Sequence, residues 1–161
     1  MSNYDSTQDT MAHIKKIQYI FNTVVIPELS RRSTDHDKSK LYSPEKETYD
    51  LYIPMLQKVK YGTPEYNEIR DKMAEQGTAH HYEVKRHHPE HFENGIIDMN
   101  LFDILEMFFD WYAASLRSDT SFEDGIKINI KKYGISDDLC NIFINTYNDY
   151  LKSNNNEFKN I

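Results

Sequence analysis

Apolar residues recur at steps of three and four through most of the chain, which is the period of a helix with one buried face. The clearest early example covers residues 10–26, and its recurring positions are Ile14, Ile17, Phe21, Val24 and Val25. Pro27 follows directly. Because proline lacks a backbone N–H, we expect this first helix to stop there.

Two matching helix starts follow. Ser43-Pro44-Glu45 and Thr63-Pro64-Glu65 each place a capping hydroxyl, a proline and an acidic residue in the order that suits a helix N-terminus. These signals predict helices over about 44–60 and 64–88.

Capping residues predict three more helices, which run from Asp98 or Asn100 to Arg117, from Ser121 to Gly134, and from Ser136 onward. The polar residues 152–161 predict a frayed tail. Strand signals are almost absent. The sequence therefore predicts an all-α fold, a single-domain bundle of about six to seven helices over residues 1–161, with an ordered core over about 10–151.

Charge and cysteine content narrow the classes of function. The chain has 161 residues, with 26 acidic against 19 basic side chains, and this acidic balance argues against a general nucleic-acid or membrane-surface binder. The single cysteine, Cys140, excludes an internal disulfide and a multi-cysteine metal site. We find neither a membrane-spanning apolar run nor the apolar region of a signal peptide, so we expect no membrane partner and a cytoplasmic location.

Histidine is distributed unevenly, since six of the seven histidines lie between His36 and His91. Any one of them taken alone is most simply a solvated surface residue. The adjacent pair His36-Asp37 offers an imidazole nitrogen and a carboxylate oxygen, which can both reach one cation if other helices supply further ligands.

Two further residues are candidate ligands. His13 lies on the apolar stripe of the first helix, and the alternative for it is a core histidine bonded to a backbone carbonyl. Asp110 lies in an almost wholly apolar helix, where a carboxylate must be paired or ligated. The alternative partners of Asp110 are Arg117, Lys38 and Lys40. Convergence of His13 and Asp110 on His36-Asp37 would favour a metal.

The order of these residues resembles the HD superfamily of metal-dependent phosphohydrolases. Two segments carry the likeness, HDKSK at residues 36–40 and EMFFDWYAA at residues 106–114, and HHPEH at residues 87–91 resembles an element of the dinuclear members. A further likeness rests on HDKSK, HHYEVKRHHPEHF at residues 80–92 and FFDWYAAS at residues 108–115. Most of the chain is further similar to a small branch found in bacteria and their phages. The resemblance implies an HD-type helical bundle, a metal held by His13, His36, Asp37 and Asp110, and a Lys40 that meets substrate phosphate.

The remaining histidines form two pairs on one predicted helix, His80-His81 and His87-His88. The pairs are seven residues apart, so equivalent members lie two turns, or ~10 Å, from each other on the same face. We interpret them as candidate second-metal ligands, general acids or substrate contacts, with Lys40, His87 and His88 as the catalytic candidates. Arg86 and Arg117 are expected to join Lys40 in binding substrate. The alternative is a solvated helix face.

The resemblance implies a phosphohydrolase or phosphodiesterase that acts on a small phosphorylated molecule, a nucleotide or cyclic nucleotide. One or two ions of Mn²⁺, Fe²⁺, Co²⁺, Ni²⁺ or Zn²⁺ suit the mixed ligands. A di-iron oxygenase and a non-catalytic module that binds a nucleotide or a partner protein stay open, as does a homodimer. The expected location is the cytoplasm of a bacterium, or of a host cell if a phage encodes the chain.

Overall fold

The computed structural model describes residues 4–160 and is helical, with no strand in that range, so the all-α prediction is confirmed. The chain divides into two units, Met1–His36 and Asp37–Ile161. The buried apolar cluster lies between Met107 and Leu151, so the apolar residues before position 37 are not part of it. Among the described residues, no helix has the length and apolarity needed to cross a membrane.

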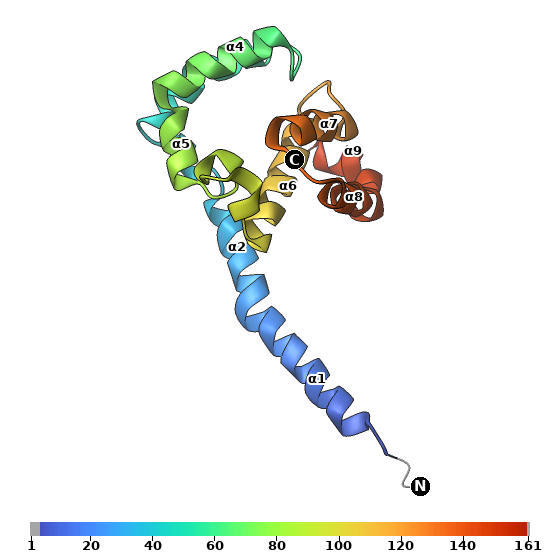
Figure 1. Ribbon diagram of the computed structural model, residues 1–161. Coiled ribbons are helices and arrows are strands. Elements are labelled where there is room, and N and C mark those ends of the chain that lie inside the picture. Colours follow the sequence, from blue (N-terminus) through green and yellow to red (C-terminus); the bar gives the residue numbers. More distant parts are fainter. Residues whose placement is uncertain (1–3, 161) are drawn as a thin grey trace. The chain divides into compact units, whose positions relative to one another are not determined.

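The first unit is a single helical rod, drawn in blue in Figure 1. It consists of α1 (Thr7–Ile20), a π turn (Phe21–Val25) and α2 (Ile26–Asp35). The expectation that Pro27 ends the helix is therefore wrong. The Ile26 N–H bonds to the Phe21 carbonyl five residues back, and this wider turn relieves the clash between the proline ring and the preceding turn.

The second unit begins with α3 (Glu45–Leu56) and α4 (Pro64–Met73). Thr63 caps α4 by accepting a hydrogen bond from the Tyr66 N–H, as its sequence predicts. At α3 the corresponding bond is not formed. Ser43 precedes a cis peptide to Pro44, and the helix starts at Glu45 without a side-chain cap.

The helix predicted over residues 64–88 ends early. After α4 come a π turn (Ala74–Thr78) and α5 (Ala79–Val84), and the backbone is then extended at Lys85. His88 is also extended, as expected for a residue before proline. His87 and His88 therefore do not share a helix with His80 and His81, which corrects the prediction of two pairs spaced two turns apart.

The helices of the second half agree with their predicted caps. They are α6 (Leu101–Leu116), α7 (Phe122–Tyr133) and α8 (Asp137–Thr146). Asn100 and Asp103 form a reciprocal capping box at the start of α6, and Ser121 and Ser136 cap the next two helices. Gly134 ends α7 with a φ of 64°, the left-handed conformation that favours glycine.

Residues 152–160 contain helical turns, contrary to the predicted frayed tail, and residue 161 lies outside the described residues. A π turn (Tyr147–Leu151) and a 3₁₀ turn (Lys152–Asn154) lead into α9 (Asn155–Phe158). The buried Tyr112 hydroxyl donates to Asn155 Oδ1 at 2.7 Å, and Phe158 packs against the core. Tertiary contacts therefore order this polar segment.

The core forms where α6 meets α7 and α8, on the side of Figure 1 coloured yellow to red. Phe108 of α6 is 2% exposed and contacts the rings of Phe122 and Phe143 at centroid distances of 5.6 and 5.1 Å. This packing holds α6 in place. Glu106 and Asp110 lie one turn apart on the same helix and take part in the site described next.

Candidate metal centre

Four side chains of the second unit meet at one point: Asp37, His81, His87 and His88. Their ligand atoms all lie within 4.8 Å of one another. His81 Nε2 is 2.9 Å from His88 Nε2 and 3.2 Å from Asp37 Oδ1, and His87 Nε2 is 3.5 Å from the same oxygen. A metal with ligands at ~2.0–2.2 Å holds neighbouring ligand atoms roughly 2.8–3.6 Å apart, so these spacings fit one ion.

Asp37 occupies an unusual backbone position. Its φ of 55° and ψ of 8° are left-handed, and it is the only non-glycine residue with positive φ among residues 4–160. Such conformations cost free energy and concentrate at functional sites. The two carboxylate oxygens divide their contacts, since Oδ1 faces the histidines while Oδ2 pairs with the Lys40 ammonium.

His81 is held from behind by Glu45, and both side chains are fully buried. His81 Nδ1 lies 2.9 Å from Glu45 Oε2, and an ionised carboxylate can only accept a hydrogen bond. The ring therefore carries its proton on Nδ1 and presents the lone pair of Nε2 to the cluster. A carboxylate behind a histidine is the usual support of a metal-ligating imidazole.

His87 has the same kind of support from α6. Its Nδ1 lies 3.2 Å from Glu106 Oε1, while its Nε2 faces Asp37. The ring is 1% exposed, and the Glu106 side chain is largely buried too. Two histidines thus each turn Nδ1 to a carboxylate and Nε2 to the same point.

His88 completes the set from the extended segment before Pro89. Burial, with the neighbouring His87, His81 and Lys40 adding to it, holds the pKa of His88 far below its usual value. The ring is consequently neutral at neutral pH. A neutral imidazole is the form that binds a metal.

Glu45 itself stays ionised despite its burial. Burial alone would raise its pKa, but hydrogen bonds from His80, Ser39 and His81 together hold the pKa below the usual value. Ser39 Oγ donates to Oε2 at 2.9 Å, and His80 Nδ1 lies 2.8 Å from Oε1. The site therefore contains a fixed negative charge behind its histidines.

Two other histidines lie outside the cluster. The side chain of His80 is 45% exposed and contacts the opposite oxygen of Glu45, so the structure does not bring it to the point shared by the other ligands. His91 Nδ1 lies 2.9 Å from the Tyr82 carbonyl oxygen, outside the group.

The prediction that His13 and His36 bind the same metal ion is wrong within a single chain. Both lie in the first unit, where His13 is an exposed residue of α1 and His36 follows the last residue of α2. The two are 23 residues apart on a continuous rod, which places them about 35 Å from each other. The expectation failed because it needed a turn at Pro27. His36 as a ligand stays a prediction, based on its peptide bond to Asp37.

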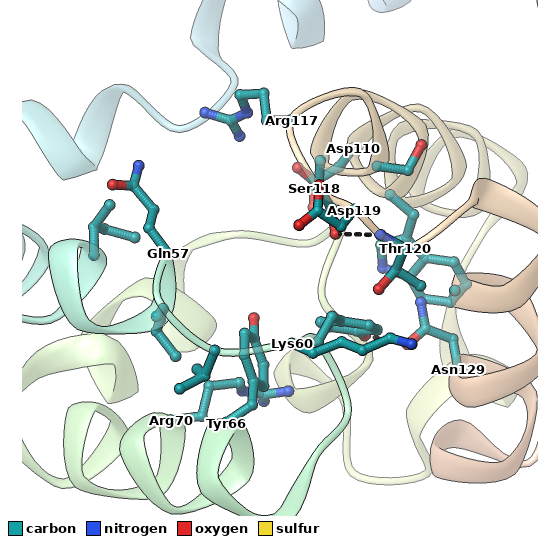
Figure 2. A pocket seen from close by; sticks show the side chains of 18 of the residues that line it. Gln57, Lys60, Tyr66, Arg70, Asp110, Arg117, Ser118, Asp119, Thr120 and Asn129 are labelled. Carbon is teal, nitrogen blue, oxygen red and sulfur yellow. Dashed lines mark hydrogen bonds between the residues drawn. The ribbon is translucent and has the colours of Figure 1, made fainter.

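Asp110 lies on α6 at the wall of a cavity of about 960 Å³, which residues of the second unit line. It offers a carboxylate oxygen within 4.8 Å of a ring nitrogen of His87. Asp37, Lys40 and His88 line the same cavity, so the cluster opens onto it. Figure 2 shows Gln57 and Arg70 facing Asp110 and the α6–α7 side across this space.

Comparison with models of protein families matches residues 2–149 to DUF5662, a family of unknown function. The chain belongs to DUF5662. No curated protein and no solved structure matches it.

The predicted substrate contacts of this DUF5662 chain divide into two groups. Lys40 and Arg117 line the cavity. Arg86 is not among the lining residues; its guanidinium pairs instead with both oxygens of the fully buried Asp103, at 2.8 and 3.1 Å. Because Asp103 belongs to the capping box of α6, the structure gives Arg86 a structural contact, and its role in substrate binding stays a prediction.

Sequence reasoning missed the two carboxylates that support the histidines of the DUF5662 centre. It assigned Glu45 to the dipole of a new helix, and it gave no role to Glu106. Neither residue carries a local signal, because each acts on a histidine 19 or more positions away.

Proposed function

We propose that this DUF5662 member is a metal-dependent hydrolase of phosphate esters, whose substrate is a small phosphorylated molecule of the nucleotide or cyclic-nucleotide class. The observation that carries the proposal is the cluster of Asp37, His81, His87 and His88 at the wall of a large cavity. The His-Asp resemblance to the HD superfamily supports the reaction type.

The donor set fits a transition metal. Three imidazole nitrogens and one carboxylate oxygen suit Mn²⁺, Fe²⁺, Co²⁺, Ni²⁺ or Zn²⁺ better than Ca²⁺, which prefers oxygen ligands. Glu45 and Glu106 orient two of the rings and leave their Nε2 lone pairs directed to one point. When bound, such an ion lowers the pKa of a water molecule and polarises a phosphoryl oxygen.

The cavity suits an anionic ligand although the whole chain is acidic. Its wall contains five basic residues against three acidic ones; the basic residues are Lys40, Lys58, Lys60, Arg70 and Arg117, and the acidic ones are Asp37, Asp110 and Asp119. Lys40 lies nearest the cluster, paired with Asp37 and 4.7 Å from the centre of the Tyr49 ring. In this proposal its ammonium neutralises charge on the substrate phosphate.

Tyrosines supply the other part of the wall. Tyr61 and Tyr66 contact edge to face at a centroid distance of 5.0 Å, and the Tyr61 hydroxyl donates to Asn129 Oδ1. All three residues line the cavity. An aromatic surface with an amide beside it supports a planar, hydrogen-bonding group at the end of the substrate away from the phosphate.

A metal analysis followed by a substrate panel tests this function. We expect the purified protein to hold a transition metal and to hydrolyse at least one nucleotide or cyclic nucleotide. Asp37→Ala should abolish both properties and leave the helical content unchanged. Asp50→Ala, which removes an exposed carboxylate from α3, is the matched control and should retain both.

Three outcomes would contradict the proposal. Bound iron with a mixed-valence spectrum and oxygen-dependent turnover would indicate an oxygenase. Tight nucleotide binding without turnover across several metals would indicate a binding module. If Asp37→Ala lost its helical content with or without metal, the His-Asp segment would be structural.

A further inference from the structure

One face of the first unit is apolar and open along most of its length. Its side chains are Met11, Ile14, Ile17, Ile20, Phe21 and Val24, and each is between 41% and 51% exposed. None of the residues of α1 is buried. Monomeric proteins rarely leave a contiguous apolar stripe of this kind in water.

The spacing within the stripe is that of paired helices. Ile14, Ile17, Phe21 and Val24 alternate at steps of three, four and three, the pattern of the a and d positions that interlock between two helices. The opposite face of the rod includes the polar residues Lys15, Lys16, Asn22 and Thr23, together with the exposed Tyr19 and Ile26.

The size of the stripe suits an interface between two chains. From Met11 to Val24 it extends ~20 Å along the rod. Half-exposed side chains of this number and size present roughly 600 Å² per chain, close to the ~800 Å² that each partner buries in a standard specific interface. One stripe packed on an equal stripe therefore reaches the size of a stable contact.

A second copy of this chain is the occupant that fits. The buried core and the apolar residues packed against it all lie between Ile96 and Phe158, so that core is built without residues of the rod. An a and d seam is self-complementary, because each of its side chains packs between those of an identical seam. We propose that the protein is a dimer in which the Met11–Val24 faces of two chains pair.

Sedimentation equilibrium of the full chain tests the dimer. The wild type should have twice the mass of one chain at micromolar concentration. Ile17→Lys with Phe21→Lys places two charges on the seam and should give the mass of one chain. Asn22→Lys with Thr23→Lys adds the same charge to the opposite face and should stay dimeric. A monomeric wild type, or a seam variant that remains dimeric, would overturn the proposal.

Cross-linking gives a second measurement if the lysine variant loses helix. In a Cys140→Ser background, Ile17→Cys with Phe21→Cys should form a two-chain disulfide product whether the helices run parallel or antiparallel. Lys15→Cys with Asn22→Cys, on the opposite face of the rod, should not. Equal cross-linking of both pairs, or none by the seam pair, would refute a seam at this face.

Discussion

At the scale of single residues, the carboxylates behind the histidines decide which ring nitrogens an ion can reach. Glu45 contacts His81 Nδ1 and Glu106 contacts His87 Nδ1, so in both rings Nε2 is left for the cluster. Asp37 splits its oxygens between that cluster and Lys40. The two rings are therefore oriented so that they could hold an ion.

Glu45→Gln should lower metal affinity about 10- to 100-fold, although Glu45 is not itself in the ligand group. The amide removes the fixed charge that holds the proton on His81 Nδ1. Competition with a chromophoric chelator measures the change. Glu47→Gln, at an exposed position two residues along α3, should bind as the wild type does, and equal affinities in both variants would contradict the role assigned to Glu45.

The lowered pKa of His88 makes the metal-free protein sensitive to acid. The unfolded chain protonates this ring near pH 6.5, whereas the folded chain keeps it neutral to much lower pH. Below about pH 6.5 the unfolded state therefore binds the extra proton, and the free energy of unfolding falls by up to ~1.4 kcal/mol per pH unit.

Urea unfolding in chelator between pH 7 and pH 5 measures this loss. His88→Gln should reduce the slope by about one proton relative to the wild type. A slope that is the same in wild type and His88→Gln would show that His88 titrates normally in the folded state.

At the scale of elements, breaks in the helices form the site. The π turn between α4 and α5 contains Gly77, which lies against Thr48 of α3. The extended backbone after Val84 then returns His87 and His88 to His81. An unbroken helix over this segment would have kept the two histidine pairs ~10 Å apart.

Gly77→Ala should lower the free energy of unfolding by about 1–3 kcal/mol, because overpacking forces neighbouring atoms to move. An added Cβ would lie 2.3 Å from Thr48 Oγ1, whose hydroxyl donates to the Gln76 carbonyl. Thermal or urea unfolding measures the loss. Gly125→Ala is the matched control, because its Cβ meets nothing within 4 Å and should be neutral or stabilising by up to ~1 kcal/mol. Equal effects would exclude the contact with Thr48 as the cause.

Arg86→Ala tests the structural role of that guanidinium at the start of α6. Losing the bidentate pair with the buried Asp103 should cost roughly 1–3 kcal/mol of stability, since the Arg86 side chain is itself half exposed. Arg117→Ala, at an exposed cavity residue, should change stability by less than ~0.5 kcal/mol and weaken phosphate binding instead. The reverse pattern in unfolding and binding assays would favour Arg86 as the substrate contact.

At the scale of the whole molecule, the two units differ in the contacts that stabilise them. The described residues of the first, 4–36, form a helical rod without a buried apolar side chain, while the second contains the aromatic core and the histidine cluster. Any ion bound by the cluster therefore stabilises the second unit directly.

A transition metal at 100 times its dissociation constant should raise the free energy of unfolding by ~2.7 kcal/mol. Chelator should reverse the change. Asp37→Ala should show no metal-dependent shift, and Asp50→Ala should show the full shift. A shift of equal size in Asp37→Ala would mean that the ion binds elsewhere.

Local chemistry alone determined several elements of this protein. Asn100, Ser121 and Ser136 cap their helices as predicted, and Gly134 ends α7, because capping depends on side chains within a few residues of the helix end. The uneven distribution of histidine likewise indicated, from the sequence alone, that residues 80–88 contain candidate site residues.

Only the tertiary structure decided which of those residues meet. The cluster combines Asp37 with three histidines at least 44 positions later. The carboxylates that support two of these histidines come from α3 and α6. The order of α9 depends on Tyr112 and the core, and the continuity of the first rod depends on a π turn that absorbs Pro27. In each case, packing between residues far apart in the sequence overrides the conformational preference of the local segment. A sequence pattern reports only that local preference.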